Sequence, residues 1–181
     1  MPLTRLVIIG MATMSLGLGA CVSSRLHRTA GETIDDTTLT ARVKASLVAD
    51  PATPARHIDV TVRRGIVQLN GFVDSASERA AALKTAQSVS GVTRVEDNLR
   101  IETRNYSAGE TIDDTWITGK VKLALVADPM TKARQIEVSC NDGVVLLGGF
   151  VDDEAAKTRA GVVAARVEHV RNVDNRLSIK Q

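Results

Sequence analysis

Hydrophobic residues recur along the chain with the spacings of short amphipathic helices and strands. Leu39, Val43 and Leu47 follow one another at intervals of four, which predicts a helix with one apolar face. Asp36 or Thr37 can cap the start of this helix, and an Asp-Pro pair ends it. The pattern therefore opens with one helix of about four turns.

Alternating apolar residues then predict two strands at 58–62 and 66–73, joined by a tight turn at 63–65. Asp74 or Ser75 can cap a second helix, and a third strand follows it. The order helix, strand, strand, helix, strand predicts an α+β unit, a three-stranded sheet with both helices packed on one face. The second helix and the last strand are indicated by Ala82, Ala86, Val89, Val95, Leu99 and Ile101.

The whole pattern occurs twice. The segment Gly-Glu-Thr-Ile-Asp-Asp-Thr at 31–37 recurs at 109–115, and the register holds at an offset of 78 with about half of the aligned positions identical. This spacing is too long for an ordinary solenoid repeat and indicates a duplicated domain. We therefore expect tandem domains at 31–101 and 109–181, which a linker as short as 102–108 should keep in contact or in a restricted relative orientation.

The first 20 residues have the pattern of a secretory signal peptide, with one cation, an apolar run and small residues at its end. Leu18-Gly19-Ala20-Cys21 resembles the bacterial lipobox, which implies that Cys21 is acylated, with palmitate among the chains, and anchors the mature protein in the outer membrane. Residues 21–30 then form a tether. Cys140 is left without a disulfide partner within the chain, and we expect it to act as a small, buried hydrophobic residue on a strand.

The repeated motifs resemble the BON domain over nearly all of residues 31–179. They comprise the Asp-Asp-Thr before each first helix, Ile-x-Val-x-Val, Gly-x-Val-x-Leu-x-Gly-x-Val, and Gly91-Val92-x-x-Val95. With the lipobox, the chain is similar to two-BON outer-membrane lipoproteins. The resemblance implies a non-enzymatic protein that faces the periplasm, supports envelope integrity and binds phospholipid through its second domain. His169 departs from the family pattern, because it stands where the first copy has Gly91 in a turn.

Composition and motifs argue against several other functions. A net charge of +2 and 2% aromatic residues are untypical of a non-specific nucleic-acid binder. His27, His57 and His169 lack metal-ligand spacing, and nothing resembles a nucleophile elbow or a phosphate loop. The Asp-Asp pairs at 35–36 and 113–114 occur at expected helix starts, where capping explains them. We therefore expect no catalytic residue, metal, cofactor or small-molecule substrate.

The two copies differ on an outward stripe of the first helix. Trp116 and Leu123 of the second copy replace Thr38 and Ala45 of the first, and Lys120 lies between them. A tryptophan beside lysines suits the bilayer interface, where its ring is buried among headgroups while ammonium groups meet lipid phosphates. The family resemblance implies the same role. We therefore predict that this stripe binds anionic phospholipid.

Charge and packing leave alternatives open. Residues 109–179 carry a net charge of −2, so attraction to anionic lipid would have to be local, through Lys120, Lys122, Lys132 and Arg134. Lys122 is accordingly part of the predicted site. Trp116 could instead pack between the domains or form a hot spot for an envelope protein partner. A module that docks periplasmic or outer-membrane proteins is thus the competing function.

Overall fold

The computed structural model describes residues 30–53, 57–102, 108–131 and 133–180. The expected signal peptide, Cys21, most of the tether, His27, Lys132 and most of the linker lie outside the described residues. Within them, the chain forms two α+β units, each with the expected order of elements. The fold class predicted from the sequence is confirmed.

The first domain is a three-stranded sheet with the order β1-β2-β3. Strands β1 and β2 form an antiparallel hairpin, and the helix α2 then carries the chain across to β3, which pairs with β2 in parallel. The central strand β2 is therefore bonded on both sides. The elements are α1 (Ala30–Ala49), β1 (Ile58–Arg63), β2 (Ile66–Val73), α2 (Ala76–Ser88) and β3 (Arg94–Ile101).

The second domain repeats this arrangement, with β5 at the centre of its sheet. A short 3-10 helix, η2, precedes its first strand. The elements are α3 (Ala108–Ala127), η2 (Ala133–Gln135), β4 (Ile136–Asn141), β5 (Val144–Val151), α4 (Glu154–Ala165), β6 (Asn172–Asn175) and β7 (Ser178–Ile179).

Each domain has its own core between helices and sheet. The predicted apolar faces of the first helices are buried, with Leu39, Val43 and Leu47 in one core and their counterparts Ile117, Val121 and Leu125 in the other. Alanines line the second helices, so these lie close to the sheets. Ser75 caps α2 and Asp153 caps α4, each through its side-chain oxygen. The cores follow the periodicity of the sequence closely.

The start of the first helix differs from the expectation. Helix α1 begins at Ala30 and α3 at Ala108, one to two turns before the Asp-Asp-Thr motif, so Asp36 and Thr37 do not cap α1. Asp36 lies inside the helix, and its carboxylate accepts the N–H groups of Arg64 and Gly65 in the β1–β2 turn. Asp36 thus accepts backbone N–H groups, as a helix cap would, but these groups belong to the neighbouring hairpin and not to the start of α1.

The third strand of the second domain also differs. It is divided into β6 and β7, so the expected three-stranded sheet has four strands. The registers of β6 and β7 place the gap opposite Gly148 and Gly149 of β5. Gly149 donates its N–H to Oε1 of Gln68 in the first domain, at 2.7 Å. The gap therefore coincides with a backbone donor that bonds across to the other domain.

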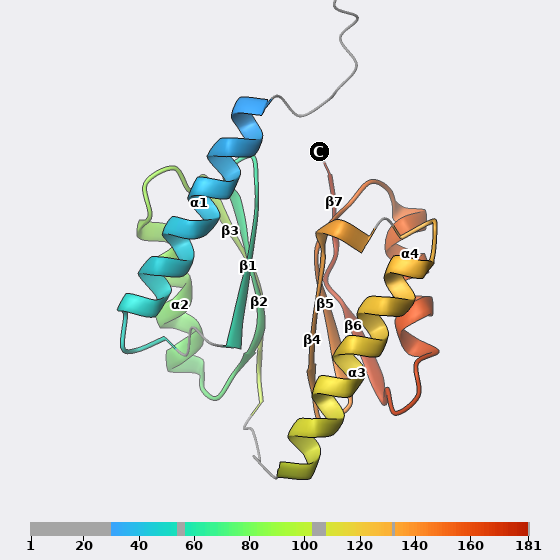
Figure 1. The fold of residues 1–181 in the computed structure, drawn as a ribbon. Coiled ribbons are helices and arrows are strands. Elements are labelled where there is room, and N and C mark those ends of the chain that lie inside the picture. Colours follow the sequence, from blue (N-terminus) through green and yellow to red (C-terminus); the bar gives the residue numbers. More distant parts are fainter. Residues whose placement is uncertain (1–29, 54–56, 103–107, 132, 181) are drawn as a thin grey trace, which may run out of the picture.

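The two sheets face each other, and the helices lie on the two outer sides (Figure 1). Strands β2 and β5 are consequently buried on both faces. One face of each lines its own core, and the other meets the opposite sheet, with Gln68, Asn70 and Phe72 on β2. We call the contact between the sheets the seam. The contact that the short linker predicted between the two units is present.

Gln68 is fully buried at the centre of the seam and uses both ends of its amide. Its Oε1 accepts from Gly149, while its Nε2 donates to Oε2 of Glu96 and to Oγ of Ser178, both at 2.8 Å. Ser178 in turn donates to Glu96. A buried amide is tolerated when its polar atoms are bonded, and here most of the partners belong to the other domain.

Asn70 packs in the seam against Gly148 of the second domain, which has no side chain. A Cβ built on Gly148 would lie 2.0 Å from Oδ1 of Asn70, far inside van der Waals contact. The ion pair between Arg100 and Asp174, at 3.1 Å, also crosses from one domain to the other. The seam thus joins long polar side chains of the first domain to a glycine and short or acidic side chains of the second.

Candidate functional site

The second aspartate of each Asp-Asp pair binds the backbone of a hairpin turn. In the second domain, Asp114 accepts the N–H groups of Asp142 and Gly143 at 2.9 and 3.0 Å, as Asp36 does in the first. Asp142 has φ 49°, a left-handed conformation that costs energy for a residue with a side chain. The carboxylate fixes the turn in this conformation. Stabilisation of the hairpin turn therefore explains both aspartates without a catalytic role.

Cys140 lies on β4 and packs against the second core. Its thiol donates to Oδ1 of Asp114, with 3.1 Å between Sγ and oxygen. Burial, followed by the hydrogen bond to that carboxylate, raises the pKa of the Cys140 thiol far above its usual range. Thiolate is the reactive form of cysteine, so Cys140 is a poor nucleophile at neutral pH.

Trp116 lies on α3 with 41% of its surface exposed. Its ring meets the imidazole of His169 edge-on, with the ring centroids 5.5 Å apart, and the Nζ of Lys120 lies 5.3 Å from the ring centroid. Both groups belong to the second domain. Helix α3 packs on the outer side of its sheet, away from the seam (Figure 1). The structure therefore does not place Trp116 between the domains, which was one of the three interpretations that the sequence left open.

His169 occupies the turn between α4 and β6 with φ 66°, where its counterpart Gly91 has φ 98°. The turn therefore keeps its left-handed backbone although the glycine has been replaced. Histidine pays a conformational penalty there, and the edge-on contact with Trp116 offsets part of it. Sequence reasoning treated His169 as a departure from the family and did not connect it with Trp116, which lies 53 positions earlier.

The predicted stripe continues beyond the residues that the sequence indicated. Leu123 is 68% exposed, and Val126 and Met130 are also exposed near the end of α3. Met130 replaces Ala52 of the first copy, so it is a further apolar gain of the second domain. Sequence reasoning missed Met130 because it follows the helix and does not share its period. We call Trp116, Leu123, Val126 and Met130 the apolar stripe.

The cations that were expected beside the stripe are spread over different faces. Lys120 lies against the Trp116 ring, within the apolar stripe. Lys122 is exposed and close enough to Glu137 on β4 to influence its pKa, which places it toward the sheet edge. Arg134 is exposed on η2, and Lys132 lies outside the described residues. Of the predicted cations within the described part of the chain, Lys120 is the one that contacts Trp116.

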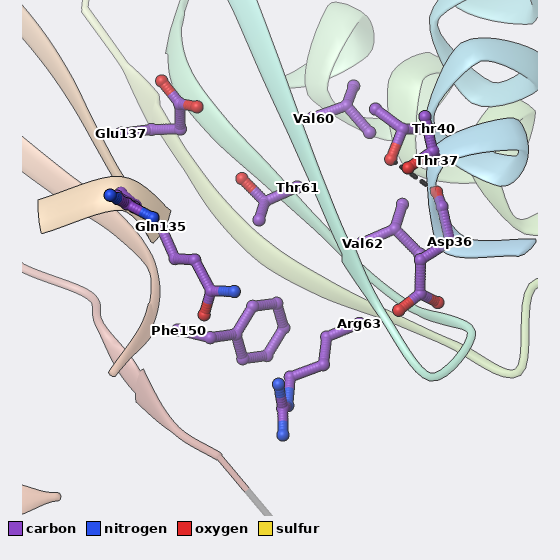
Figure 2. Close-up of a pocket in the computed structure, with 11 residues that line it drawn as sticks. Asp36, Thr37, Thr40, Val60, Thr61, Val62, Arg63, Gln135, Glu137 and Phe150 are labelled. Atoms are coloured by element: carbon purple, nitrogen blue, oxygen red, sulfur yellow. Dashed lines mark hydrogen bonds between the residues drawn. The ribbon is translucent and has the colours of Figure 1, made fainter. Parts of the chain in front are cut away.

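A small pocket of about 190 Å³ opens at one side of the seam (Figure 2). Gln135, Glu137 and Phe150 of the second domain lie opposite Thr61 and Arg63 of the first. Burial raises the pKa of Glu137, and the nearby Asp59 carboxylate adds to the rise. The pocket is below the size of about 300–1,000 Å³ that is common for ligand sites, and we assign it to the seam.

The described residues contain neither a membrane-spanning helix nor a cluster of metal-ligating side chains. The helices among residues 30–53, 57–102, 108–131 and 133–180 are too short or too polar to cross a bilayer. In the same part of the chain, histidine, cysteine, aspartate and glutamate side chains do not gather in threes as metal ligands would.

The geometry thus defines a two-domain α+β protein whose candidate surface is an exposed apolar stripe with an associated cation. The BON domain model matches residues 35–103 and 113–181, so the chain belongs to the BON domain family and carries two copies of its domain. The resemblance drawn from the sequence motifs is confirmed.

The chain is also similar to two bacterial proteins along most of their length, and to one solved structure. Osmotically-inducible protein Y of Escherichia coli is 36% identical over 93% of this chain and 84% of its own length. Outer membrane lipoprotein DolP of Haemophilus influenzae is 29% identical over 95% of this chain and 94% of its own length. A solved structure, the C-terminal domain of the type III secretion protein CdsD of Chlamydia trachomatis, shares 13% identity over 79% of this chain and 98% of its own, with a TM-score of 0.33.

Proposed function

We propose that this protein is a non-enzymatic outer-membrane lipoprotein that faces the periplasm, is anchored through Cys21, and binds anionic phospholipid with its second domain. Its role would be to support the integrity of the envelope. The envelope location draws on the relatives, one of which is named an outer membrane lipoprotein and matches along nearly its whole length. The lipobox at residues 18–21 supports the anchor.

The observation that carries the lipid proposal is the apolar stripe on α3. Trp116 and Leu123 are exposed on α3, and Met130 is exposed just after it; their counterparts in the first domain are a threonine and two alanines. An apolar residue shared by both domains belongs to the common fold, whereas one gained on an outward face requires another explanation. Insertion among lipid headgroups supplies one, because it buries these side chains.

Lys120 supports the choice of an anionic lipid. Its ammonium group lies over the Trp116 ring, so a ring inserted at headgroup depth would bring this cation to the level of the lipid phosphates. Leu123 would add apolar surface to the inserted face, and Lys122 would contribute attraction from the flank. The second domain as a whole is slightly acidic, so binding should depend on this local cation and weaken as salt is added.

The test is hydrogen exchange on the full chain held in vesicles of neutral lipid or of neutral and anionic lipid. The proposal predicts slower exchange of α3 amides in the anionic vesicles alone, with α1 unchanged as the internal control. The variant Trp116→Thr with Leu123→Ala, which restores the residues of the first domain, should lose this protection and keep its fold. Val48→Ala removes a comparably exposed apolar side chain from α1 and should leave the protection intact.

Equal exchange in both kinds of vesicle would contradict the proposal. Unfolding of the double variant would instead indicate that the two side chains stabilise the domain. Co-purification of an envelope protein that requires Trp116 and is indifferent to lipid would favour the competing function, a module that docks protein partners.

A further inference from the structure

The two domains contain the same hollow, but it is larger in the first. In each domain it lies between the first helix, the hairpin turn and the loop before the third strand. Its volume is about 490 Å³ in the first domain and about 250 Å³ in the second. Ligand sites commonly enclose about 300–1,000 Å³, so only the first hollow has the size of a binding site.

Side chains of the second domain account for the difference. Trp116 and His169 pack together at the positions of Thr38 and Gly91. Arg171 pairs with Asp142 at 2.6 Å and closes the other side, where the first domain has a threonine in place of the arginine. Larger side chains of the second domain, His169 and Arg171 among them, therefore narrow a space that is wider in the first domain.

The open hollow is lined by the counterparts of both residues that contact the Trp116 ring in the second domain. Leu39 is buried beneath it, and a Cβ built on Gly91 would lie 3.6 Å from Cδ1 of Leu39. Arg42, which lines the hollow, stands at the position of Lys120, the residue whose ammonium group lies over the Trp116 ring. The first domain thus has an apolar base and a cation at its hollow, and it lacks the aromatic side chain.

We propose that this hollow in the first domain binds an aromatic side chain of a partner protein, which takes the place that Trp116 occupies in the second domain. The ring would rest on the apolar base formed by Leu39 and Gly91. The Arg42 guanidinium is placed to cover its face, an arrangement favourable for arginine and aromatic rings. The proposal goes beyond lipid binding because it concerns the other domain and another class of partner.

The rim of the hollow favours a ring with a polar edge over a lipid. Asp35 lies on the rim together with Arg42 and Arg64, so its charge is mixed. An anionic headgroup would meet the Asp35 carboxylate, and a saturated acyl chain has no polar atom to offer the charged rim. Tyrosine and tryptophan combine an apolar body with a polar tip, which matches an apolar base below a polar rim.

The test is an amide chemical-shift titration of the full chain with N-acetyltryptophanamide, and with N-acetylleucinamide as the matched aliphatic probe. The aromatic probe should produce saturable shifts at Thr38, Gly65 and Gly91, and the aliphatic probe should bind clearly more weakly. Thr38→Trp places the ring of the second domain in the hollow and should abolish these shifts. Thr38 is exposed, so the fold should persist. Arg42→Ala should weaken binding about two- to fivefold through loss of the cation.

A reverse graft provides the matched control. Trp116→Thr with His169→Gly opens the hollow of the second domain, and the aromatic probe should then also shift the amide of Gly143. Three results would overturn the proposal: no saturable shift in the unmodified chain, equal binding of both probes, or undiminished binding by a folded Thr38→Trp variant. If Thr38→Trp fails to fold, Arg42→Ala decides, and binding that is unaffected by it would overturn the role of the cation.

Discussion

The two domains share a fold at about half sequence identity and differ in what their surfaces contact. On the inner side, the first domain supplies Gln68 and Asn70 to the seam, where the second has Leu146 and Gly148. On the outer side, the second domain carries the apolar stripe and has a smaller hollow, whereas the first domain has a larger, open hollow. Duplication has thus kept the cores alike while the surfaces took different roles.

The substitution with the largest expected effect on this comparison is Gly148→Leu. A side chain at this position overlaps Asn70, so the sheets must separate or Asn70 must leave the seam. Overpacking typically costs about 1–3 kcal/mol, and displacement of the Gln68 hydrogen bonds would add to it. We expect urea unfolding, followed by circular dichroism, to shift to lower denaturant and to change from one transition into two.

Gly119→Ala is the control for that experiment. Gly119 lies within α3, and a Cβ built there meets nothing within 4 Å. Alanine in a helix is favoured over glycine by about 1 kcal/mol, so this variant should be slightly more stable than the unmodified chain. A Gly148→Leu variant as stable as the parent would show that the seam does not hold the domains together.

A smaller effect is expected from Glu137→Gln, which tests the acidic side of the seam. Burial and the Asp59 carboxylate raise the pKa of Glu137 in the folded protein. Between its ordinary pKa of about 4.3 and the raised value, the folded state binds more protons than the unfolded state. The contribution of Glu137 to stability is therefore complete below the ordinary pKa and is lost as pH rises through the folded pKa.

Glutamine at position 137 keeps the shape of the glutamate side chain and removes its titratable carboxyl group. We expect thermal melts of Glu137→Gln to show a higher midpoint than the parent at pH 7 and a flatter dependence on pH above about 4.3. Asp174 gives the opposite dependence, because hydrogen bonds from Arg176 and Arg100 lower its pKa and its contribution is lost as pH falls. A Glu137→Gln melt that is lower than the parent at pH 7 would contradict the proposed repulsion.

The smallest expected effect concerns the turn at His169. His169→Gly restores the residue of the first domain, relieves the left-handed strain and removes the edge-on ring contact with Trp116. These changes oppose each other in stability, so a change of at most about 1 kcal/mol is expected. The emission of Trp116, the single tryptophan, should move to longer wavelength as the ring becomes more hydrated. An unchanged spectrum would mean that His169 does not shield the ring.

Periodicity predicted much of this fold because each core face follows the period of its element. Leu39, Val43 and Leu47 are buried as a helix requires, and the strands begin where the alternation begins. The duplication strengthened these predictions, since each pattern could be read twice. The start of the first helix was misplaced because an aspartate that bonds a neighbouring hairpin resembles an N-cap in sequence.

The seam and part of the surface could not be predicted. Gln68 and Asn70 alternate with core residues, and a polar residue on a strand indicates solvent unless the opposite sheet is known. Likewise, the pairing of His169 with Trp116 depends on two elements that are distant in sequence. The stripe itself was predicted at Trp116 and Leu123 by comparison of the copies, while its extension to Met130 required the structure.

The most direct test of lipid binding by the second domain uses Trp116 as a native probe. The emission of the full chain is recorded in neutral vesicles and in vesicles that contain anionic lipid, with brominated acyl chains as quenchers. The account predicts a blue shift and quenching in the anionic vesicles, both of which Lys120→Ala reduces. Emission that is the same in both kinds of vesicle and insensitive to the brominated chains would contradict it.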